Sequence, residues 1–505
     1  MTQLDDSTLA PHLVLRINGV RIAIKGGNWG MDDWRKRVSR ERLEPYFRLQ
    51  RDAHFNVVRN WVGQNTGASF FDLADEYGML VLNDFWQSTQ NYNMEPADAA
   101  LFLANAAEVI TRFRNHTSIV LWFGRNEGVP APILNEGLDA LVAALDGTRW
   151  YTASSNEVNL QGSGPYNYRE PVAYFNKLAQ GFSVEVGTPS FSTLESFKAS
   201  VPAVQDQWPI SDSWAYHDWH QSGNGDTASF MRSLSDKLGA PTSLDDFERK
   251  AQLLNYETYR AIFEGFNAQL WTKNSGRLLW MSHPAWPSNM WQIYSHDYDT
   301  HAAYYGVRNA AEPLHVQMNL PGHEVVVVNN TTTAVRGLRV RAETYAADGR
   351  LLQQREQAVD AAAVAVSAPV LQLTPLLANA KDLGFVRLQL LERDGTVRSR
   401  NFYWVARDAA AMRCLDALAP VPLELTTQLQ AGDAPVLSAT VRNPSQHVAL
   451  GAKLTLVDAQ GQRILPAYYS DNYLNLAPGE SRTVEIRGPA EASLRAARVQ
   501  LRGWN

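Results

Sequence analysis

A chain of 505 residues is longer than one hydrophobic core usually supports, so we expect two to four domains. Its 45% hydrophobic and 19% charged residues exclude a disordered chain, and Cys414, the only cysteine, excludes an intrachain disulfide or a cysteine zinc site. A net charge of −6, scattered basic residues and the lack of a long apolar run exclude nucleic acid and membrane as partners.

The chain opens with a leading β-segment over residues 1–21. Apolar residues alternate in LVLRINGVRIAIKGGNW on both sides of Asn18-Gly19. This pair of residues is favoured in two-residue hairpin turns. We therefore expect a hairpin ahead of the first domain.

Residues 22–316 alternate short apolar or β-branched runs with amphipathic stretches, as parallel strands joined by helices do. The pattern predicts eight strands, the sixth of them weak, over 22–27, 55–61, 79–85, 118–124, 149–155, 162–168, 181–187 and 277–283. Eight such units predict an α/β domain with a (β/α)8 TIM barrel fold, which is the catalytic domain. The stretch of about 189–276 interrupts the alternation and is dense in Trp, His and Asp, so we interpret it as an insertion that roofs the active-site mouth.

After the barrel the pattern changes to short alternating strands separated by Asn, Gly and Pro turns. This rhythm runs through residues 317–408 and recurs in residues 409–505. It is typical of antiparallel β-sandwiches of about 100 residues. The TIM barrel is therefore expected to be followed by two immunoglobulin-like β-sandwich domains.

Polar residues stand at the ends of the predicted barrel strands, where barrels of this kind place their chemistry. They are Arg59 and Trp61 after the second strand, Asp84 after the third, Asn126 and Glu127 after the fourth, and Glu185 at the end of the seventh.

Glu127 and Glu185 could form the pair of carboxyl groups that splits a glycosidic bond. One carboxyl group must protonate the leaving oxygen while the other attacks the anomeric carbon or activates water. A single glutamate at a strand end could equally be a solvated loop residue. Two glutamates at strand ends facing one mouth favour chemistry, and Asn126 could then hydrogen-bond a substrate hydroxyl.

Several motifs together resemble glycoside hydrolase family 2, in its β-mannosidase and exo-β-glucosaminidase branch. They are KGGNW, SFFDLADEYGMLVLNDFW, WFGRNEG, FSVEVG and RNAAEPLHVQMNL. The similarity is greatest to mannosylglycoprotein endo-β-mannosidases, which act on N-glycan cores. It implies a retaining enzyme with Glu127 as acid/base and Glu185 as nucleophile.

The same resemblance implies sugar-binding roles for Arg59, Trp61, Asp84 and Trp286. It also makes Tyr168 a candidate to hydrogen-bond the nucleophile. Arg59 and Asp84 could instead pair with each other as a structural brace. Trp286 lies in a Pro-rich loop after the eighth strand, where stacking on a sugar is favoured over core packing.

A metal site and a cofactor are not expected. His217 and His220 flank Asp218 and Trp219, but their spacing lacks a third ligand at a familiar distance. They could instead line the sugar cleft or cap the insertion. The two-carboxylate mechanism needs no cofactor.

Three functions remain open. The first is hydrolysis of β-mannosidic bonds, such as Man-β-1,4-GlcNAc in N-glycan cores. The second is exo-β-D-glucosaminidase action on chitosan oligosaccharides, for which Asp84 or Asp218 could contact the amino group. The third is an inactive carbohydrate-binding or scaffold protein, against which the presence of both glutamates argues.

Complete members of the family carry a jelly-roll and a first sandwich before the barrel, and neither is seen here. We therefore expect a partner chain or self-association to cover the exposed flank, since large bare apolar patches are rare on monomers. The opening residues lack the basic and apolar regions of a secretory signal. Periplasmic or extracellular placement would suit a glycan-degrading enzyme, but the compartment stays unknown.

Overall fold

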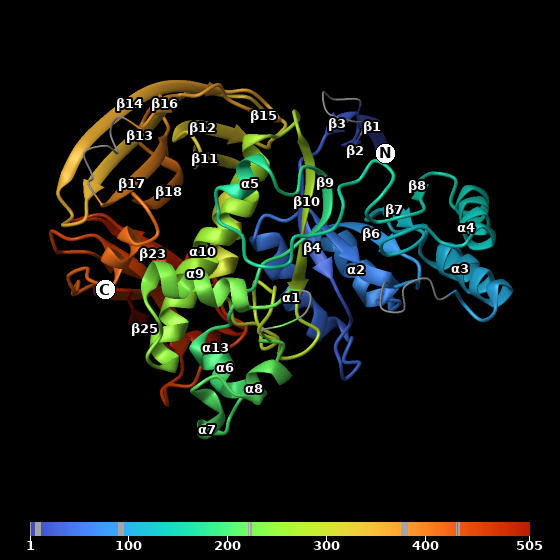
Figure 1. The fold of residues 1–505 in the computed structure, drawn as a ribbon, viewed down its shortest axis with the longest axis horizontal. Helices are drawn as coiled ribbons and strands as arrows, with labels where there is room; N and C mark the ends of the chain where they lie inside the picture. Colours follow the sequence, from blue (N-terminus) through green and yellow to red (C-terminus); the bar gives the residue numbers. More distant parts are fainter. Residues whose placement is uncertain are drawn as a thin grey trace.

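The protein is described from a computed structural model that covers residues 2–5, 12–88, 95–220, 222, 225–374, 382–430, 432 and 435–505. Figure 1 shows the barrel strands and helices on one side and two β-rich regions on the other, with the long helix α10 (Leu244–Ala268) between them. Among the described helices, none combines the length and the apolar character needed to cross a lipid bilayer.

The predicted hairpin closes the amino end of the barrel. Strand β2 (His12–Ile17) pairs antiparallel with β1 (Thr2–Asp5) and with β3 (Val20–Arg21). Asn18 and Gly19 have φ angles of 50° and 81°, as the predicted two-residue turn requires. Leu13 and Leu15 of β2 pack into the barrel interior.

Seven parallel strands form the barrel sheet, in the order β8-β7-β6-β5-β4-β10-β9. Their bounds are β4 Ile24–Trp29, β5 Val57–Asn60, β6 Leu80–Asp84, β7 Ile119–Phe123, β8 Trp150–Thr152, β9 Gly181–Val186 and β10 Asn274–His283. Apolar side chains from six of them fill the interior together with the hairpin: Ile24, Val57, Leu82, Leu121, Phe123, Phe182, Val184 and Leu278.

The prediction of a sixth strand over 162–168 is wrong. Between β8 and β9 the chain makes a single parallel bridge, Gln161 to Ser183, and then runs irregularly beside β9. Gly164 N donates to the Glu185 carbonyl at 3.0 Å, and Gly187 N donates to the Pro165 carbonyl at 2.8 Å. Gly164 has a φ of 92° and Pro165 has no amide hydrogen, so this sequence cannot continue a ladder.

The KGG run of β4 meets a crowded part of the sheet. A Cβ on Gly26 would lie 2.0 Å from the Val57 carbonyl oxygen, and one on Gly27 would lie 2.3 Å from Ser282 Oγ. Any side chain here would force neighbouring strands apart. The two glycines therefore allow β4 to sit close to both of its neighbours.

Helices cover the outer face of the sheet and form a continuous apolar layer with it. They are α1 Arg40–Asp52, α2 Ala68–Tyr77, α3 Ala99–Phe113, α4 Pro132–Leu145, the one-turn α5 Ala173–Asn176, α10, and α11 Ala302–Ala310. A 3-10 turn, η1 Trp61–Gly63, follows β5.

The insertion is shorter than the predicted 189–276, because α10 packs against the barrel as the helix that leads into β10. Its own helices are α6 Leu194–Ser200, α7 Val204–Gln207, α8 Asp212–Tyr216 and α9 Ala228–Leu238. An aromatic cluster holds them to α10: Phe191, Trp214, Trp219, Phe230 and Phe247.

Two β-sandwiches follow, each made of two antiparallel sheets around its own apolar core. The first contains β11 Leu314–Asn319, β12 Glu324–Asn329, β13 Val335–Ala346, β14 Leu351–Ala361, β15 Ala365–Val366, β16 Leu371–Gln372, β17 Leu383–Leu391 and β18 Val397–Ala406. After η3 (Ala411–Leu415), the second contains β19 Glu424–Gln430, β20 Val436–Arg442, β21 Ala449–Val457, β22 Tyr468–Tyr469, β23 Leu474–Leu476, β24 Ser481–Arg487, α13 Glu491–Arg495 and β25 Arg498–Arg502.

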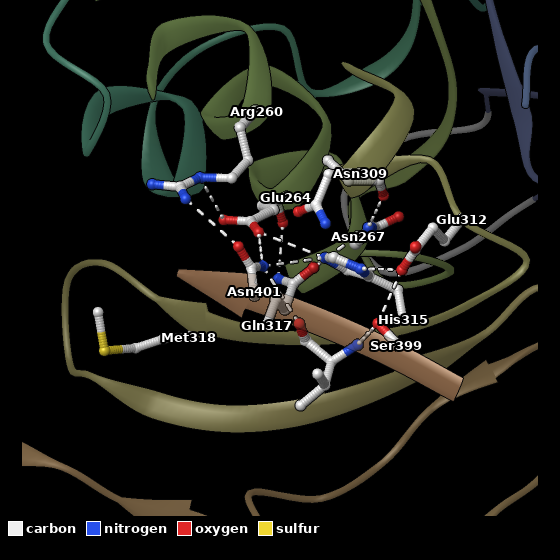
Figure 2. A network of polar contacts seen from close by, with 12 residues as sticks. Arg260, Glu264, Asn267, Asn309, Glu312, His315, Gln317, Met318, Ser399 and Asn401 are labelled. Carbon is white, nitrogen blue, oxygen red and sulfur yellow. Dashed lines mark hydrogen bonds and ion pairs between the residues drawn. The ribbon is translucent and has the colours of Figure 1, made fainter. Parts of the chain in front are cut away.

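A buried polar network joins the barrel to the first sandwich (Figure 2). Glu264 of α10 accepts hydrogen bonds from Asn401 Nδ2 at 2.6 Å and from Tyr403 Oη at 2.8 Å, both on β18. His315 of β11 lies between two carboxylates, 3.3 Å from Glu264 and 3.2 Å from Glu312. Burial opposes its charge, but these two carboxylates outweigh burial and raise the pKa of His315.

Candidate active site

Glu127 and Glu185 meet at one tyrosine hydroxyl at the carboxyl end of the barrel sheet. Glu185 is buried in β9, while Glu127 is half-buried just after β7 and has a φ of 45°. Tyr166 Oη donates to Glu185 Oε2 at 2.5 Å and lies 3.3 Å from Glu127 Oε1. The fold therefore brings together two acidic side chains that are 58 positions apart in the chain.

The expectation that Tyr168 would hydrogen-bond Glu185 is wrong. Tyr168 is buried under the insertion, where its hydroxyl accepts a hydrogen bond from Lys237 Nζ at 3.0 Å. Tyr166 occupies the expected position instead. The two tyrosines lie two residues apart in an irregular segment, so strand alternation could not have distinguished them.

Arg59 lies at the buried end of the site and connects its polar side chains. Its Nη1 donates to Glu185 Oε1 at 2.6 Å, and its Nε and Nη2 donate to the two oxygens of Asp84 at 3.0 and 2.6 Å. Nη2 also donates to Asn126 Oδ1 at 2.9 Å. The Arg59 and Asp84 side chains are both 0% exposed. The expectation that they touch a sugar directly is therefore corrected in favour of the brace, which holds Glu185 and Asn126 in place.

Burial and charge set the protonation of this cluster. Burial raises the pKa of Glu185 above its usual value, against the opposing effects of Arg59 and of the Tyr166 hydrogen bond. Burial and the adjacent Glu185 also raise the pKa of Tyr166, so the phenol keeps its proton and stays a donor. For Arg59, burial opposes the charge, but Asp84 and Glu185 outweigh it and raise the guanidinium pKa.

Aromatic side chains lie beside these groups. The Trp61 ring meets the Trp280 ring edge-on at 5.2 Å, and Trp280 in turn lies 6.4 Å from Trp291. Trp291 Nε1 donates to the Tyr166 carbonyl at 3.0 Å. Trp61 was expected here, whereas Trp280 and Trp291 were not singled out from the sequence. The position of Trp280 near the end of the eighth predicted strand was the available signal.

Trp286 lies where the insertion meets the loop after β10. Its Nε1 donates to Asp218 Oδ2 at 3.0 Å, and its ring stacks on His217 at 5.3 Å. His217 Nδ1 is hydrogen-bonded to the Pro287 carbonyl, and His220 Nδ1 to that of Ser222. In the part of the chain that the structure describes, no group of three His, Cys, Asp or Glu residues could hold a metal ion.

Residues 12–163 match the TIM barrel domain of glycosyl hydrolases family 2, and residues 401–505 match the exo-β-D-glucosaminidase Ig-fold domain. The mannosylglycoprotein endo-β-mannosidase of Lilium longiflorum is 30% identical over 97% of this chain and 64% of its own length. The exo-β-D-glucosaminidase of Streptomyces avermitilis is 31% identical over 97% of this chain and 60% of its own. The chain belongs to glycoside hydrolase family 2.

Two solved structures share the fold of this protein over the whole chain. The exo-chitosanase of Amycolatopsis orientalis superimposes with a TM-score of 0.91 at 24% identity, covering 100% of this chain and 65% of its own. The β-D-mannosidase of Dictyoglomus thermophilum superimposes with a TM-score of 0.81 at 20% identity, covering 62% of its own chain. The TIM barrel followed by immunoglobulin-like sandwiches, predicted from the sequence, is confirmed. The family 2 chain spans 60–65% of the length of these proteins.

Proposed function

We propose that this family 2 chain is a retaining glycosidase that cleaves β-mannosidic bonds, such as Man-β-1,4-GlcNAc of N-glycan cores. The observation that carries the proposal is the shared tyrosine hydroxyl. The Tyr166 hydroxyl lies 3.3 Å from Glu127 Oε1 and 2.5 Å from Glu185 Oε2. The distance between the two carboxyl oxygens therefore cannot exceed the sum of these two distances. That limit lies below the roughly 6.5 Å at which the separations of inverting enzymes begin.

In the first step, Glu185 attacks the anomeric carbon while the bond to the leaving oxygen breaks. Glu127 gives its proton to that oxygen, and a covalent glycosyl-enzyme is formed. In the second step, Glu127 takes a proton from water, and the water oxygen displaces Glu185. Two inversions at the same carbon restore the β configuration.

Arg59 and Tyr166 suit Glu185 to act as the nucleophile. Together they present two hydrogen-bond donors to a buried carboxyl group, and both donors oppose the rise in its pKa that burial causes. Charge-assisted hydrogen bonds of this kind favour the ionised form. Among the described residues, no guanidinium pairs with the Glu127 carboxyl group, and Glu127 is more exposed, as befits a group that exchanges protons with water.

A second candidate is exo-β-D-glucosaminidase action on chitosan oligosaccharides. The match of residues 401–505 and the Streptomyces relative favour it. An amino sugar needs an acidic contact for its ammonium group, and Asp84 is enclosed by Arg59. Asp218 is half-buried beside Trp286, and it is the remaining candidate for that contact.

Hydrolysis of aryl β-mannoside, β-glucosaminide and β-galactoside by the purified chain separates these candidates. Proton NMR of the first-formed sugar should show the β anomer before mutarotation. Glu185→Gln should abolish turnover while the protein stays folded, whereas Glu157→Gln, at an exposed glutamate after β8, should keep full activity. Activity retained by Glu185→Gln, or an α anomer formed first, would refute the mechanism.

A further inference from the structure

Three aromatic residues lie at the surface in segments that follow barrel strands, and we call Trp34, Tyr216 and Trp286 the aromatic rim. Trp34 is 50% exposed and Tyr216 is 72% exposed, while Trp286 is half-buried. Large aromatic side chains are mostly buried in folded proteins, so this exposure stands out. None of the three takes part in the catalytic steps proposed above.

The rim residues lie in segments that follow three neighbouring strands, and one of these strands, β9, carries Glu185. Trp34 lies in the loop after β4, Trp286 in the loop after β10, and Tyr216 at the end of α8 in the insertion after β9. Strands β4, β10 and β9 are adjacent in the sheet. All three loops leave the carboxyl end of the barrel, the end at which the two glutamates meet.

Hydrogen bonds and ring contacts connect the three rim loops. Trp34 N donates to the Ala285 carbonyl at 3.0 Å, directly before Trp286. The Tyr216 ring meets the Trp286 ring edge-on at 5.4 Å, and Asn289 N donates to the His217 carbonyl at 3.0 Å. The rim is therefore one connected surface.

The loop that carries Trp34 is fixed in place. Asp33, almost fully buried, accepts hydrogen bonds from Arg37 Nε at 3.0 Å and Nη2 at 2.8 Å, and from the Arg35 amide at 2.9 Å. His296 Nε2 lies 2.9 Å from the same carboxylate. An exposed ring on a pinned loop loses little further entropy when a ligand binds.

We propose that the aromatic rim binds sugar units beyond the cleaved bond, so that the preferred substrate is a β-linked oligosaccharide of three or more units. Exposed ring faces pack against the C–H faces of sugars. The Arg35 guanidinium, 4.4 Å from the Trp34 ring, and the Asp218 carboxylate offer hydrogen bonds to hydroxyl groups. This inference rests on the proposed glycosidase function for its kinetic test, but not for its binding test.

Binding is measured by titration calorimetry on the full chain carrying Glu185→Gln. The probes are β-1,4-linked mannosyl and glucosaminyl tetrasaccharides and the matching monosaccharides. The tetrasaccharide of the preferred sugar should bind at least tenfold more tightly than its monosaccharide. Adding Trp34→Ala or Tyr216→Ala should weaken tetrasaccharide binding by roughly fivefold to tenfold. Val204→Ala, at a residue 77% exposed on α7, is the matched control and should leave the affinity unchanged.

In the active chain, the kinetic measure is the ratio of kcat/KM for the tetrasaccharide to that for the aryl glycoside. Trp34→Ala should lower this ratio by a similar factor, and Val204→Ala should not. If the chain cleaves glycosides but neither the ratio nor the affinity responds to Trp34→Ala and Tyr216→Ala, the rim inference is overturned. If these variants change only the mass seen by light scattering, the rim is a protein contact and the inference also fails. A chain that cleaves nothing yet binds tetrasaccharides through the rim would refute the proposed function alone.

Discussion

The Tyr166 hydroxyl donates a hydrogen bond of 2.5 Å to Glu185. Tyr166 lies in the irregular segment between β8 and β9 that replaces the predicted sixth strand. The irregular segment 161–165 follows β9 through backbone hydrogen bonds and so places the tyrosine over the carboxylate. The departure from a regular barrel is thus what positions a side chain of the candidate site.

Replacing Tyr166 should change both the rate and its pH dependence. The Tyr166 hydrogen bond lowers the pKa of Glu185, so Tyr166→Phe should raise that pKa and move the acid limb of the kcat/KM profile to higher pH. Loss of one donor should reduce kcat/KM by about 10- to 100-fold. Tyr168→Phe, which removes a hydroxyl bonded to Lys237, is the control and should leave the acid limb in place. An equal effect of both variants would contradict the assignment.

Removing Asp84 should destabilise the barrel. Arg59 and Asp84 form a two-bond ion pair with 0% side-chain exposure, and Asp84→Asn leaves a buried guanidinium undercompensated. We expect a loss of about 3 kcal/mol in the free energy of unfolding, measured by denaturant titration. The exposed pair of Arg40 and Glu76 provides a comparison, since Glu76→Gln should have no measurable effect. Similar losses in both variants would argue against a buried brace.

His301 should lower the free energy of unfolding in acid. Burial lowers its pKa to about 3, so the folded state keeps it neutral while the unfolded chain binds a proton below about pH 6.5. The unfolded state then holds more protons, and stability falls with decreasing pH between these two values. The contribution is about 1.4 kcal/mol per pH unit. His301→Gln should flatten the slope of unfolding free energy against pH by this amount, and an unchanged slope would contradict the prediction.

His315 should act in the opposite direction. Glu264 and Glu312 raise its pKa, so its stabilising charge is fully present below about pH 6.5 and is lost as the pH rises through the folded pKa. His315→Gln should therefore unfold more readily than the parent protein at pH 6, with the difference shrinking in alkaline solution. Melting temperatures of both proteins between pH 6 and 10 test this, and a constant difference would refute it.

The sequence predicted seven barrel strands because each is a short apolar run that its own residues reveal. The prediction of the sixth strand failed because Gly164 and Pro165 interrupt it, and hydrogen bonds to β9 determine the path of this segment. The length of the insertion was also overestimated. This happened because the apolar pattern of α10 does not tell from the sequence whether the helix packs against the barrel or belongs to the insertion.

Within the candidate site, residue type and strand order indicated Glu127 and Glu185, since strand ends of a parallel sheet meet at one edge. Strand order also indicated that Arg59 and Asp84, which end adjacent strands, could pair. Sequence could not indicate the burial of that pair, which depends on how the sheet curls. Trp280 was missed because an apolar residue near a strand end resembles core packing, and Trp291 was missed because it lies in the loop after β10.

The buried network of Glu264, His315 and Asn401 limits how this chain can be divided. A fragment ending at residue 316 would cut through β11 and strip Glu264 of the amide and phenol that solvate it. Recombination of this barrel with parts of other enzymes should therefore carry the first sandwich along, with crossover points placed after β18.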